Sequence, residues 1–472
     1  MELDNSLVDL TKDEASSVTI GKLSGSGVFN MRLNSEDHSK GDMLYIGEGS
    51  GTHTVNIVGG ITGGLENISE DNPLRFATVK NSGGILEVAG SGINAFTKDA
   101  GIYDLEYFVT KEDFDKNDEE NEVYNGGADG SIVDETGGHK GFKPGNNFVE
   151  NVLDADGTAE NWIITGVKEK KESDTVDTII NMSHANYKNA VYMDRLNKRL
   201  GEARYIDGDE GMWVRMRHDR IGMKDEFRSM NTMYQLGYDK LDNKDDKGER
   251  HIGAAIDYMD GSTSYSDIYG EGETRRWGFW MYDTWLGSKG HYADYVAKFG
   301  HMHNEFDIRS MNTGEKITGD YDNNVFSISA EYGRKKDIGN NWYFEPQAQL
   351  QLARVTDAEY KTSQDTDVYV DGINSLIGRA GFRLGKDVDE RSTVYIKADV
   401  LHEFLGDQRI TAGDVTGSLD KTYENKGTWY DIGFGFATAV GHNSYAYLDF
   451  EKSFGNDNDD TYQINAGLQW NF

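Results

Sequence analysis

Few residues of this sequence have types and a spacing that could support chemistry. His301 and His303 would share one face of a strand and could contribute to a metal site, but we interpret them as histidines at a rim. The run Asn456-Asp-Asn-Asp-Asp460 carries oxygen ligands that suit Ca²⁺, yet it lacks the ordered spacing of a calcium loop. Gly47-Glu-Gly-Ser-Gly51 predicts a turn rather than a ligand loop. We therefore predict no metal site, and a solvated hairpin tip at 456–460.

The motifs of the common enzyme classes are missing from the sequence. It contains no Gly-X-Ser-X-Gly, no His-Glu-X-X-His and no phosphate-binding loop. The chain has no Cys, which excludes disulfides, thiolate metal sites and a Cys nucleophile. We predict that these residues do not form an enzyme and need no cofactor.

The composition favours a protein made of many strands. The chain has 56 Gly, 3 Pro, 26 Tyr, 20 Phe and 8 Trp, which suits strands joined by tight turns better than disorder. No apolar run approaches the length of a transmembrane helix, but a barrel strand needs only every second residue to be apolar. The net charge of −34 makes nucleic acid an unsuitable partner, because binding it requires a basic face.

The last residues, 462–472, alternate between apolar and polar side chains. A strand places successive side chains on opposite faces, so this strand has one apolar and one wet face. The same alternation occurs in 342–352, 394–404 and 430–440, where charged residues, Gln or Gly occupy the second face. A soluble sandwich would have an apolar core there, whereas a membrane barrel has a wet lumen. We count twelve candidate strands, which start near residues 211, 228, 250, 274, 291, 322, 342, 375, 393, 427, 444 and 460.

The connections between these strands support a membrane barrel. Short turns are expected at Ser288-Lys-Gly290, Asp337–Asn340 and Gly441–Ser444. Long loops are expected on the opposite side, whereas Arg217–Asp225 is short. Short turns on one side and long loops on the other are typical of outer-membrane barrels. The expected long loops are Met259–Glu273, Asp307–Asn323, Asp357–Asn374 and Gly406–Gly427.

The region before the barrel divides into short strands and one helix. Spacing of about ten residues fits a β-solenoid or a sandwich over 1–110. The acidic, Gly-rich stretch 111–160 predicts a solvated insertion, and Asn161–Gly166 a last strand. Between 167 and 205, apolar residues recur at spacings of three and four, and Ser173 or Asp174 could cap a helix. The candidate solenoid strands are Val18–Ile20, Val28–Leu33, Leu44–Ile46, His53–Ile57 and Ile85–Val88.

Four sequence motifs resemble the autotransporters of the type V secretion class. The family's helix-to-barrel junction is similar to Leu196-Asn-Lys-Arg-Leu-Gly-Glu202 followed by Gly211-Met-Trp-Val-Arg215. Its mid-barrel motifs resemble Trp342–Leu350 and Gly378–Gly385, and its barrel-assembly signal resembles Gln469-Trp-Asn-Phe472. Upstream, Leu23–Arg32 and Gly51–Ile57 look like the pertactin-like, autochaperone end of a passenger. Within these motifs, the junction residues are Leu196, Asn197, Lys198, Arg199, Gly201, Trp213 and Arg215, and the assembly signal comprises Tyr462, Ile464, Leu468, Trp470 and Phe472.

The resemblance implies three regions and an all-β fold. We expect a pertactin-like β-solenoid passenger end at 1–166, with the acidic insertion at 111–160. A pore-threading helix at 167–205 and a 12-stranded antiparallel transmembrane β-barrel at 206–472 would follow. The implied function is an outer-membrane translocator that anchors its passenger and presents or secretes it at the surface of a Gram-negative-type bacterium. Its implied partners are outer-membrane lipid, the barrel-assembly machinery and periplasmic chaperones, and we expect a monomeric barrel.

The charges predict how the helix occupies the pore. Its end is basic, whereas the candidate lumen positions are acidic, so opposite charges would hold the helix as a plug. The expected basic residues are Arg195, Lys198, Arg199 and Arg204, and the expected acidic residues are Glu345, Asp399, Glu403 and Asp431.

One position departs from the resemblance. Serine-protease autotransporters cleave themselves at an Asn-Asn pair, which is here Asp194-Arg195. Asp cannot cyclise as Asn does, so we predict no intramolecular cleavage there.

Two other functions remain open from the sequence. A surface adhesin would bind through the solenoid fragment or the long loops, and cells carrying it would adhere or aggregate. A porin-like channel would keep the N-terminal region in the periplasm and leave the pore open. Met1-Glu-Leu-Asp-Asn5 is not a signal peptide, so we expect an exported chain to be a fragment or to start upstream.

Overall fold

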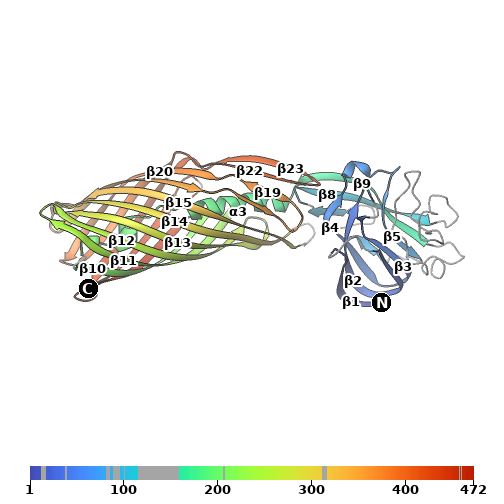
Figure 1. The fold of residues 1–472 in the computed structure, drawn as a ribbon, viewed down its shortest axis with the longest axis horizontal. Helices are drawn as coiled ribbons and strands as arrows, with labels where there is room; N and C mark the ends of the chain where they lie inside the picture. Colours follow the sequence, from blue (N-terminus) through green and yellow to red (C-terminus); the bar gives the residue numbers. More distant parts are fainter. Residues whose placement is uncertain are drawn as a thin grey trace.

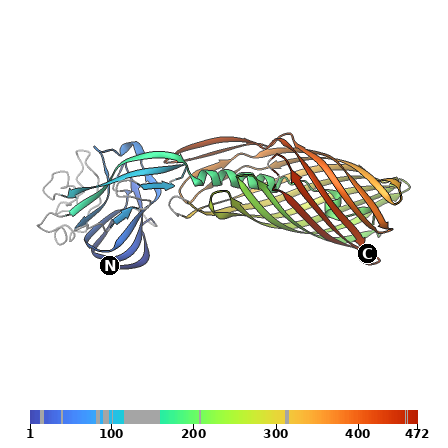
Figure 2. The same ribbon diagram turned by 180° about the vertical axis from the view of Figure 1, so that it is seen from behind.

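The computed structural model describes residues 1–11, 17–37, 40–80, 86–88, 96–99, 101–114, 159–205, 208–310, 316–456, 458 and 460–472. Figure 1 shows an elongated molecule, with the N-terminal strands at one end and a barrel at the other. The C-terminus lies at the barrel end remote from the N-terminal strands, as both views show (Figures 1 and 2). We call the barrel end that faces the N-terminal strands the near rim and the opposite end the far rim.

The first strands of the chain stack in parallel. β2 is shared between two rows: its first part pairs with β3, and its second part pairs with β1 and β4. β4 continues to β6 and β3 to β5, again in parallel. The strands expected in this region fall within β2, β3, β4 and β6, except that Ile85 of the last one lies outside the described residues. The bounds are β1 (Glu2–Asp9), β2 (Ser17–Asn34), β3 (Met43–Gly49), β4 (Thr52–Thr62), β5 (Leu74–Lys80) and β6 (Leu86–Val88), with a 3-10 turn at Leu65–Asn67.

Antiparallel strands end this parallel stack. β9 (Ala159–Glu172) pairs with β5 on one side and with β8 (Tyr103–Phe114) on the other, and β8 pairs with β7 (Phe96–Asp99). The expected insertion at 111–160 is therefore strand at both ends, and its remainder, 115–158, lies outside the described residues. The core under these sheets is apolar and includes Leu23, Phe29, Ile46, Val55 and Phe76, all 0% exposed.

The expected single helix is interrupted. β9 continues past Gly166 to Glu172, so helix begins only at α3 (Asp174–Ala190). The Ser173 side chain accepts a hydrogen bond from Val176 N, as expected for a capping residue. Residues 191–195 are not helical, and α4 (Leu196–Leu200) and a 3-10 turn (Ala203–Tyr205) follow.

Side chains of the barrel wall replace the helical hydrogen bonds at this break. Gln351 Nε2 donates to the Val191 carbonyl and Gln349 Nε2 to the Asp194 carbonyl, both at 2.7 Å. The Leu196 N–H donates to the Glu331 carboxylate at 2.9 Å. Because backbone groups away from water must be paired, these wall residues allow the chain to unwind inside the lumen.

Twelve antiparallel strands close into the barrel, as predicted. Neighbours in the sequence pair with each other, β26 pairs with β10, and β15 pairs with β17, so the ring has no edge. The bounds are β10 (Glu210–Met223), β11 (Phe227–Asp245), β12 (Gly248–Tyr265), β13 (Tyr269–Gly287), β14 (His291–Arg309), β15 (Lys316–Arg334), β17 (Trp342–Val355), β20 (Ile373–Asp389), β21 (Ser392–Glu403), β24 (Gly427–Ala439), β25 (Ser444–Phe454) and β26 (Tyr462–Asn471).

The two faces of the barrel wall differ as the alternation predicted. On β24, Ile432 and Phe434 face outward and are 56% and 55% exposed, whereas Asp431 faces inward and is 4% exposed. On β17, Glu345 and Gln351 are buried on the inward face. An apolar outer face around a polar lumen suits a strand wall that crosses lipid. No described helix is both long and apolar enough to cross a membrane.

Two of the expected long loops are wrong. Most of Met259–Glu273 belongs to β12 and β13, and most of Asp307–Asn323 belongs to β14 and β15. Strand pairing continues to the ends of these elements, from Tyr269↔Arg309 on one pair to Arg309↔Lys316 on the next. The polar residues that suggested loops instead pair with neighbouring strands, where the barrel wall extends toward the near rim.

The other two long connections hold a small sheet at the near rim. The β17–β20 connection contains β18 (Ala358–Lys361) and β19 (Asp367–Val370). The β21–β24 connection contains β22 (Asp407–Asp414) and β23 (Gly417–Glu424). Together they form a four-stranded sheet, which we call the loop sheet. At the far rim, β16 (Lys336–Gly339) pairs with β17 in a hairpin.

Apolar side chains of the near rim surround the first half of α3. Val176 and Ile179 pack with Val368 and Ile410 of the loop sheet. Met182 and its neighbours pack against the near ends of β10 to β15. Of the residues of α3, all but Asp177 and Lys188 are buried, so the helix fills the barrel at this level.

Candidate functional site: the helix segment held in the lumen

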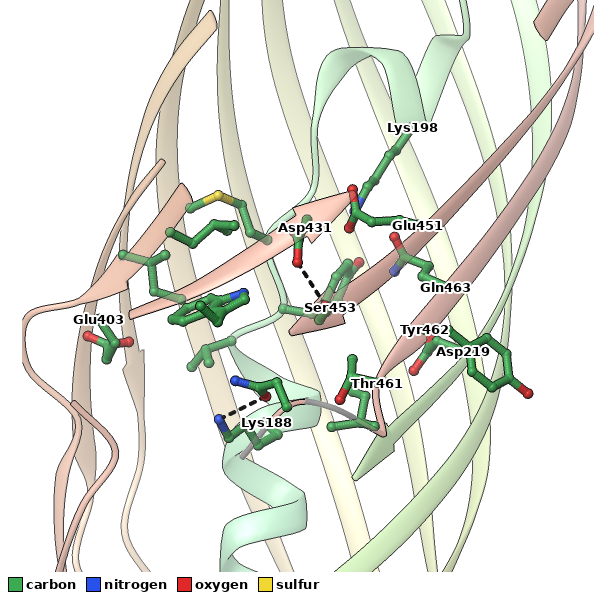
Figure 3. Close-up of a pocket in the computed structure, with 18 of the residues that line it drawn as sticks. Lys188, Lys198, Asp219, Glu403, Asp431, Glu451, Ser453, Thr461, Tyr462 and Gln463 are labelled. Carbon is green, nitrogen blue, oxygen red and sulfur yellow. Dashed lines mark hydrogen bonds and ion pairs between the residues drawn. The ribbon is translucent and has the colours of Figure 1, made fainter. Parts of the chain in front are cut away.

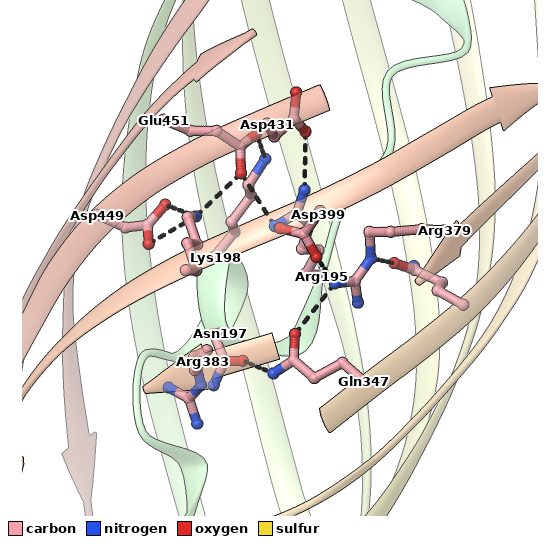
Figure 4. A network of polar contacts seen from close by, with 12 residues as sticks. Arg195, Asn197, Lys198, Gln347, Arg379, Arg383, Asp399, Asp431, Asp449 and Glu451 are labelled. Carbon is pink, nitrogen blue, oxygen red and sulfur yellow. Dashed lines mark hydrogen bonds and ion pairs between the residues drawn. The ribbon is translucent and has the colours of Figure 1, made fainter. Parts of the chain in front are cut away.

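Arg195 lies at the centre of a buried ionic network inside the barrel. Its guanidinium group contacts Asp399 at 2.7 Å, Asp431 at 2.9 Å and Glu451 at 3.0 Å (Figure 4). The first two acids were predicted to face the lumen, whereas Glu451 was missed. Its place on β25 could have revealed it, because Asp449 and Glu451 alternate with the apolar residues Leu448 and Phe450.

The cation at Lys198 belongs to the same network. Its ammonium contacts Glu451 at 2.6 Å, and Lys397 contacts Asp449 at 2.6 Å and Glu451 at 3.1 Å. On the neighbouring strand β20, Arg379 joins Asp399 at 2.7 Å. Four strands, α4 and the link before it therefore share one set of charges.

A second network lies closer to the far rim. Arg204 contacts Glu345 at 2.9 Å and Glu202 at 2.8 Å, and Arg383 contacts the same two acids at 2.8 and 3.1 Å. Arg199 is separate: it contacts Asp294 at 2.7 Å and lies over the Tyr282 ring at 4.3 Å. Glu202 lies on the segment 191–205 that follows α3, which we call the linker. The linker therefore supplies charges of both signs.

Glu403 does not contact the basic segment, contrary to our grouping. Its carboxylate accepts hydrogen bonds from Tyr187 Oη at 2.7 Å and Ser375 Oγ at 2.5 Å. The N–H groups of Leu376 and Leu405 donate to it at 2.8 and 3.0 Å. Glu403 therefore holds α3 to the wall through neutral donors, on the near side of the network.

The basic side chains of these ion pairs are buried. Arg195, Lys198 and Arg199 are 3%, 3% and 0% exposed. Breaking a buried pair by removing one partner costs about 3–5 kcal/mol, because the remaining charge is left in a poorly solvated place. Each pair therefore favours the position that its residue has in the lumen.

Aromatic side chains form a collar around α4. Tyr447 Oη donates to the Arg199 carbonyl at 2.7 Å, and Tyr445 Oη donates to the Leu200 carbonyl at 2.8 Å. Gly201, at φ +62°, lies against the Tyr447 ring. These bonds satisfy carbonyls at the C-terminal end of α4 that have no helical partner.

Six aromatic rings on the inward face, including that of Tyr447, each rest over a glycine of a neighbouring strand. A Cβ added at Gly467 would lie 2.3 Å from the Tyr447 ring, and one added at Gly237 would lie 2.1 Å from the Trp213 ring. Only a residue without a side chain leaves room for a ring laid flat across the strand. The other pairs are Gly253 with Tyr282, Gly333 with Tyr292, Gly385 with Tyr343 and Gly435 with Tyr395. Sequence reasoning missed this pattern, because each glycine and its ring are far apart in the sequence.

The predicted junction residues lie together at the entrance to the barrel wall. Leu196, Leu200 and Trp213 pack in one apolar cluster. Arg215 contacts Asp194 at 2.7 Å and Asn465 at 2.7 Å. Asn197 accepts a hydrogen bond from Gln347 at 3.2 Å, which joins the junction to β17.

The predicted assembly signal lies on β26 and at Phe472, which directly follows it. β26 closes the barrel by pairing with β10. Leu468, Trp470 and Phe472 are 39%, 44% and 63% exposed on the outer face. Tyr462 and Ile464, nearer the near rim, are half-buried. The Phe472 N–H donates to the Glu210 carbonyl at 2.9 Å, which joins the last residue to the first strand of the barrel.

The residues considered for chemistry have structural partners. His303 contacts Asp322 at 2.8 Å on the outer face, and His301 contacts Asn324 at 3.0 Å. Asp460 pairs with Arg220 and Arg228, and residues 457 and 459 lie outside the described residues. Within the described part of the chain, no group of three or more His, Asp or Glu is placed to hold a metal ion.

A closed antiparallel wall, apolar outside and sealed inside by its own upstream segment, defines an outer-membrane translocator barrel. The family described as Autotransporter beta-domain matches residues 211–451, and the chain belongs to that family. Its barrel is therefore an outer-membrane translocator domain, and such barrels are not catalytic.

Known proteins similar to this chain are autotransporters. The pertactin autotransporter of Bordetella parapertussis is 30% identical over 271 residues, which cover 55% of this chain and 28% of the relative. Autotransporter CRAC of Citrobacter rodentium is 25% identical over 500 residues, covering 100% of this chain and 28% of the relative. The β-domain structure of the Bordetella autotransporter BrkA is 22% identical with a TM-score of 0.46, and it covers 56% of this chain and 100% of its own. The chain spans less than a third of the length of these two curated relatives.

Proposed function

We propose that this chain anchors a passenger in the outer membrane and presents it at the cell surface. The observation that carries the proposal is the path of the chain. It leaves the N-terminal strands through β9, enters the barrel at the near rim as α3, and joins the wall at β10 after α4. If the near rim faces outward, the N-terminal strands lie outside the cell and remain tethered through the pore.

The N-terminal strands would form the membrane-proximal end of a β-solenoid passenger. The parallel pairing of β1, β2, β4 and β6 supports this assignment, because solenoids stack equivalent strands in register. Antiparallel β8 and β9 would terminate the stack before the helix. We keep the division at 1–166, 167–205 and 206–472 as a proposal, with strand β9 crossing the first boundary.

The helix would serve as a plug held by the charges at Arg195, Lys198, Arg199 and Arg204. The outer face of β26, ending at Phe472, would be read by the barrel-assembly machinery, and periplasmic chaperones would carry the unfolded barrel to it. Every barrel strand is paired on both sides, so a single chain suffices to span the bilayer.

The same epitope, placed at two different turns in separate variants, tests the orientation of the barrel in the membrane. One replaces the exposed turn at Glu70–Asp71 before β5, and the other replaces the far-rim turn at Asp246–Lys247. With a signal peptide supplied, intact Gram-negative cells should bind antibody at the first epitope, and only permeabilised cells at the second. Protection of the first epitope until the membrane is broken would favour the porin-like channel and overturn the proposal.

A further inference from the structure

The lumen is not filled evenly around the helix. A cavity of about 120 Å³ lies between the end of α3 and the wall formed by β24, β25, β26 and β10. On the opposite side, the space between Ala190 and β13, β14 and β15 is only about 10 Å³. The helix therefore seals against one half of the wall and stands away from the other.

The cavity runs from the near rim to the ionic network. Asn458 and Thr461, on the turn that joins β25 to β26, line its end at the near rim. Asp431 and Glu451 of the Arg195 network line its inner end. Figure 3 shows Lys188 and Thr461 toward the first end and Asp431 and Glu451 toward the second.

Two side chains that line the cavity, those of Lys188 and Gln463, are only partly buried. Lys188 is one of only two residues of α3 that are not buried, and it lines the cavity. Its ammonium donates to Asn458 Oδ1 at 3.4 Å, which is long for a charged donor. Gln463 faces the lumen from β26 and is half-buried, whereas the next inward residue, Asn465, is 0% exposed.

One donor of a buried cation also lines this space. Arg217 is 0% exposed and its Nε pairs with Asp219 at 2.6 Å, but its Nη1 has no hydrogen-bond partner among the described residues. Leaving a charged donor unsatisfied in a dry place is costly, so polar cavities of sufficient size hold water. A volume of about 120 Å³ has room for roughly four water molecules at about 30 Å³ each.

We propose that this cavity is a water-filled vestibule that opens at the near rim and admits small hydrophilic solutes as far as the Arg195 network. Apolar residues such as Trp429 and Leu401 form most of its wall, but charged and amide groups occupy both of its ends. The plugged barrel is thus wet along one side of its helix and dry along the other.

Because the chain has no Cys, single introduced thiols can report on water access. Gln463→Cys places a thiol in the vestibule, and Ser327→Cys places one on the inward face of β15, beside the tight side of the helix. The full chain is purified in detergent and treated with a charged methanethiosulfonate reagent, which reacts with thiols that water reaches. Heat-modifiable migration on gels checks that each barrel is folded.

The expected result is that Gln463→Cys reacts at least tenfold faster than Ser327→Cys, while the parent chain does not react. Equal rates at the two positions, or no reaction at Gln463 in a folded barrel, would overturn the proposal. If Gln463→Cys does not fold, Thr461→Cys near the rim provides the same comparison. The experiment depends only on how the helix sits in the barrel, so its failure leaves the epitope test of the proposed function unaffected.

Discussion

The carboxylate of Asp414 accepts the backbone N–H of Ile102 at 2.9 Å, across 312 positions of the sequence. Asp414 is the last residue of β22 in the loop sheet, and Ile102 is 0% exposed just before β8. The same carboxylate accepts from Thr366 at 2.7 Å and from Thr416 N at 2.8 Å. The near rim of the barrel therefore holds the end of the N-terminal strands, next to the start of α3.

Removing this acceptor should loosen the joint without unfolding the barrel. Asp414→Ala leaves the buried Ile102 N–H unpaired, which costs about 1–3 kcal/mol. We expect hydrogen exchange of the Ile102 amide to become about 10- to 100-fold faster, as measured by mass spectrometry or NMR.

The matched control is Asp420→Ala in the same sheet. Asp420 is exposed, and hydrogen bonds from Arg409 lower its pKa, but it does not contact the N-terminal strands. Unchanged exchange at Ile102 in Asp414→Ala would show that the joint does not depend on this carboxylate.

Reversing the charges of α4 should open the pore. In the double variant Lys198→Glu and Arg199→Glu, the new carboxylates would face Glu451 and Asp294. The native Lys198 and Arg199 contact these two acids at 2.6 and 2.7 Å. Repulsion should displace the linker and raise the ion conductance of the protein in planar bilayers.

Arg409→Glu on the exposed loop sheet serves as the control for this measurement, because it changes the net charge equally per site and lies outside the lumen. If the conductance stays the same after the exchange at Lys198 and Arg199, the proposal that opposite charges hold the helix as a plug is wrong.

The ring of Tyr447 should tolerate no side chain at Gly467. Gly467→Val would place atoms inside the ring, since even a Cβ lies 2.3 Å away. Overpacking of this kind costs about 1–3 kcal/mol, and we expect a lower yield of heat-modifiable barrel.

The neighbouring change Ala466→Val is the control, because that side chain points to the outer face. The double variant Gly467→Val with Tyr447→Ala should recover part of the yield. A normal yield from Gly467→Val alone would contradict the close contact.

The chain should remain uncut between Asp194 and Arg195. The Asp194 side chain lacks the amide nitrogen that attacks the carbonyl when Asn cyclises, and Arg215 holds it at 2.7 Å. Mass spectrometry of the folded protein should find one species of 52.8 kDa for this chain. Fragments whose ends meet at the Asp194–Arg195 bond would contradict the prediction. The variant Arg195→Ala, incubated in the same way, controls for ordinary proteolysis.

The outward and inward positions of the barrel strands could be read from the sequence. A period of two is a local property, so Ile432, Phe434 and Asp431 were assigned to the correct faces. The inward position of Asp399 and Asp431 was also visible, because the face of a strand residue depends only on parity, but the wall also carries buried bases such as Arg379 and Arg383. Predictions failed where polar residues continue a strand, as at Asp307, because polarity does not distinguish a loop from a ladder outside lipid.

Which charges meet could not be predicted from the sequence. Arg195 joins acids from β21, β24 and β25, while Glu403 accepts from Tyr187 and contacts no cation of the basic segment. The break of the helix at 191–195 depends on glutamines of β17, which donate to carbonyls that the sequence alone would leave helical. The apolar outer face and the polar inner face of the wall were visible in the sequence, because they follow from neighbours along the chain. Partner choice depends on register, closure and the rotation of the helix, which arise only when distant segments pack together.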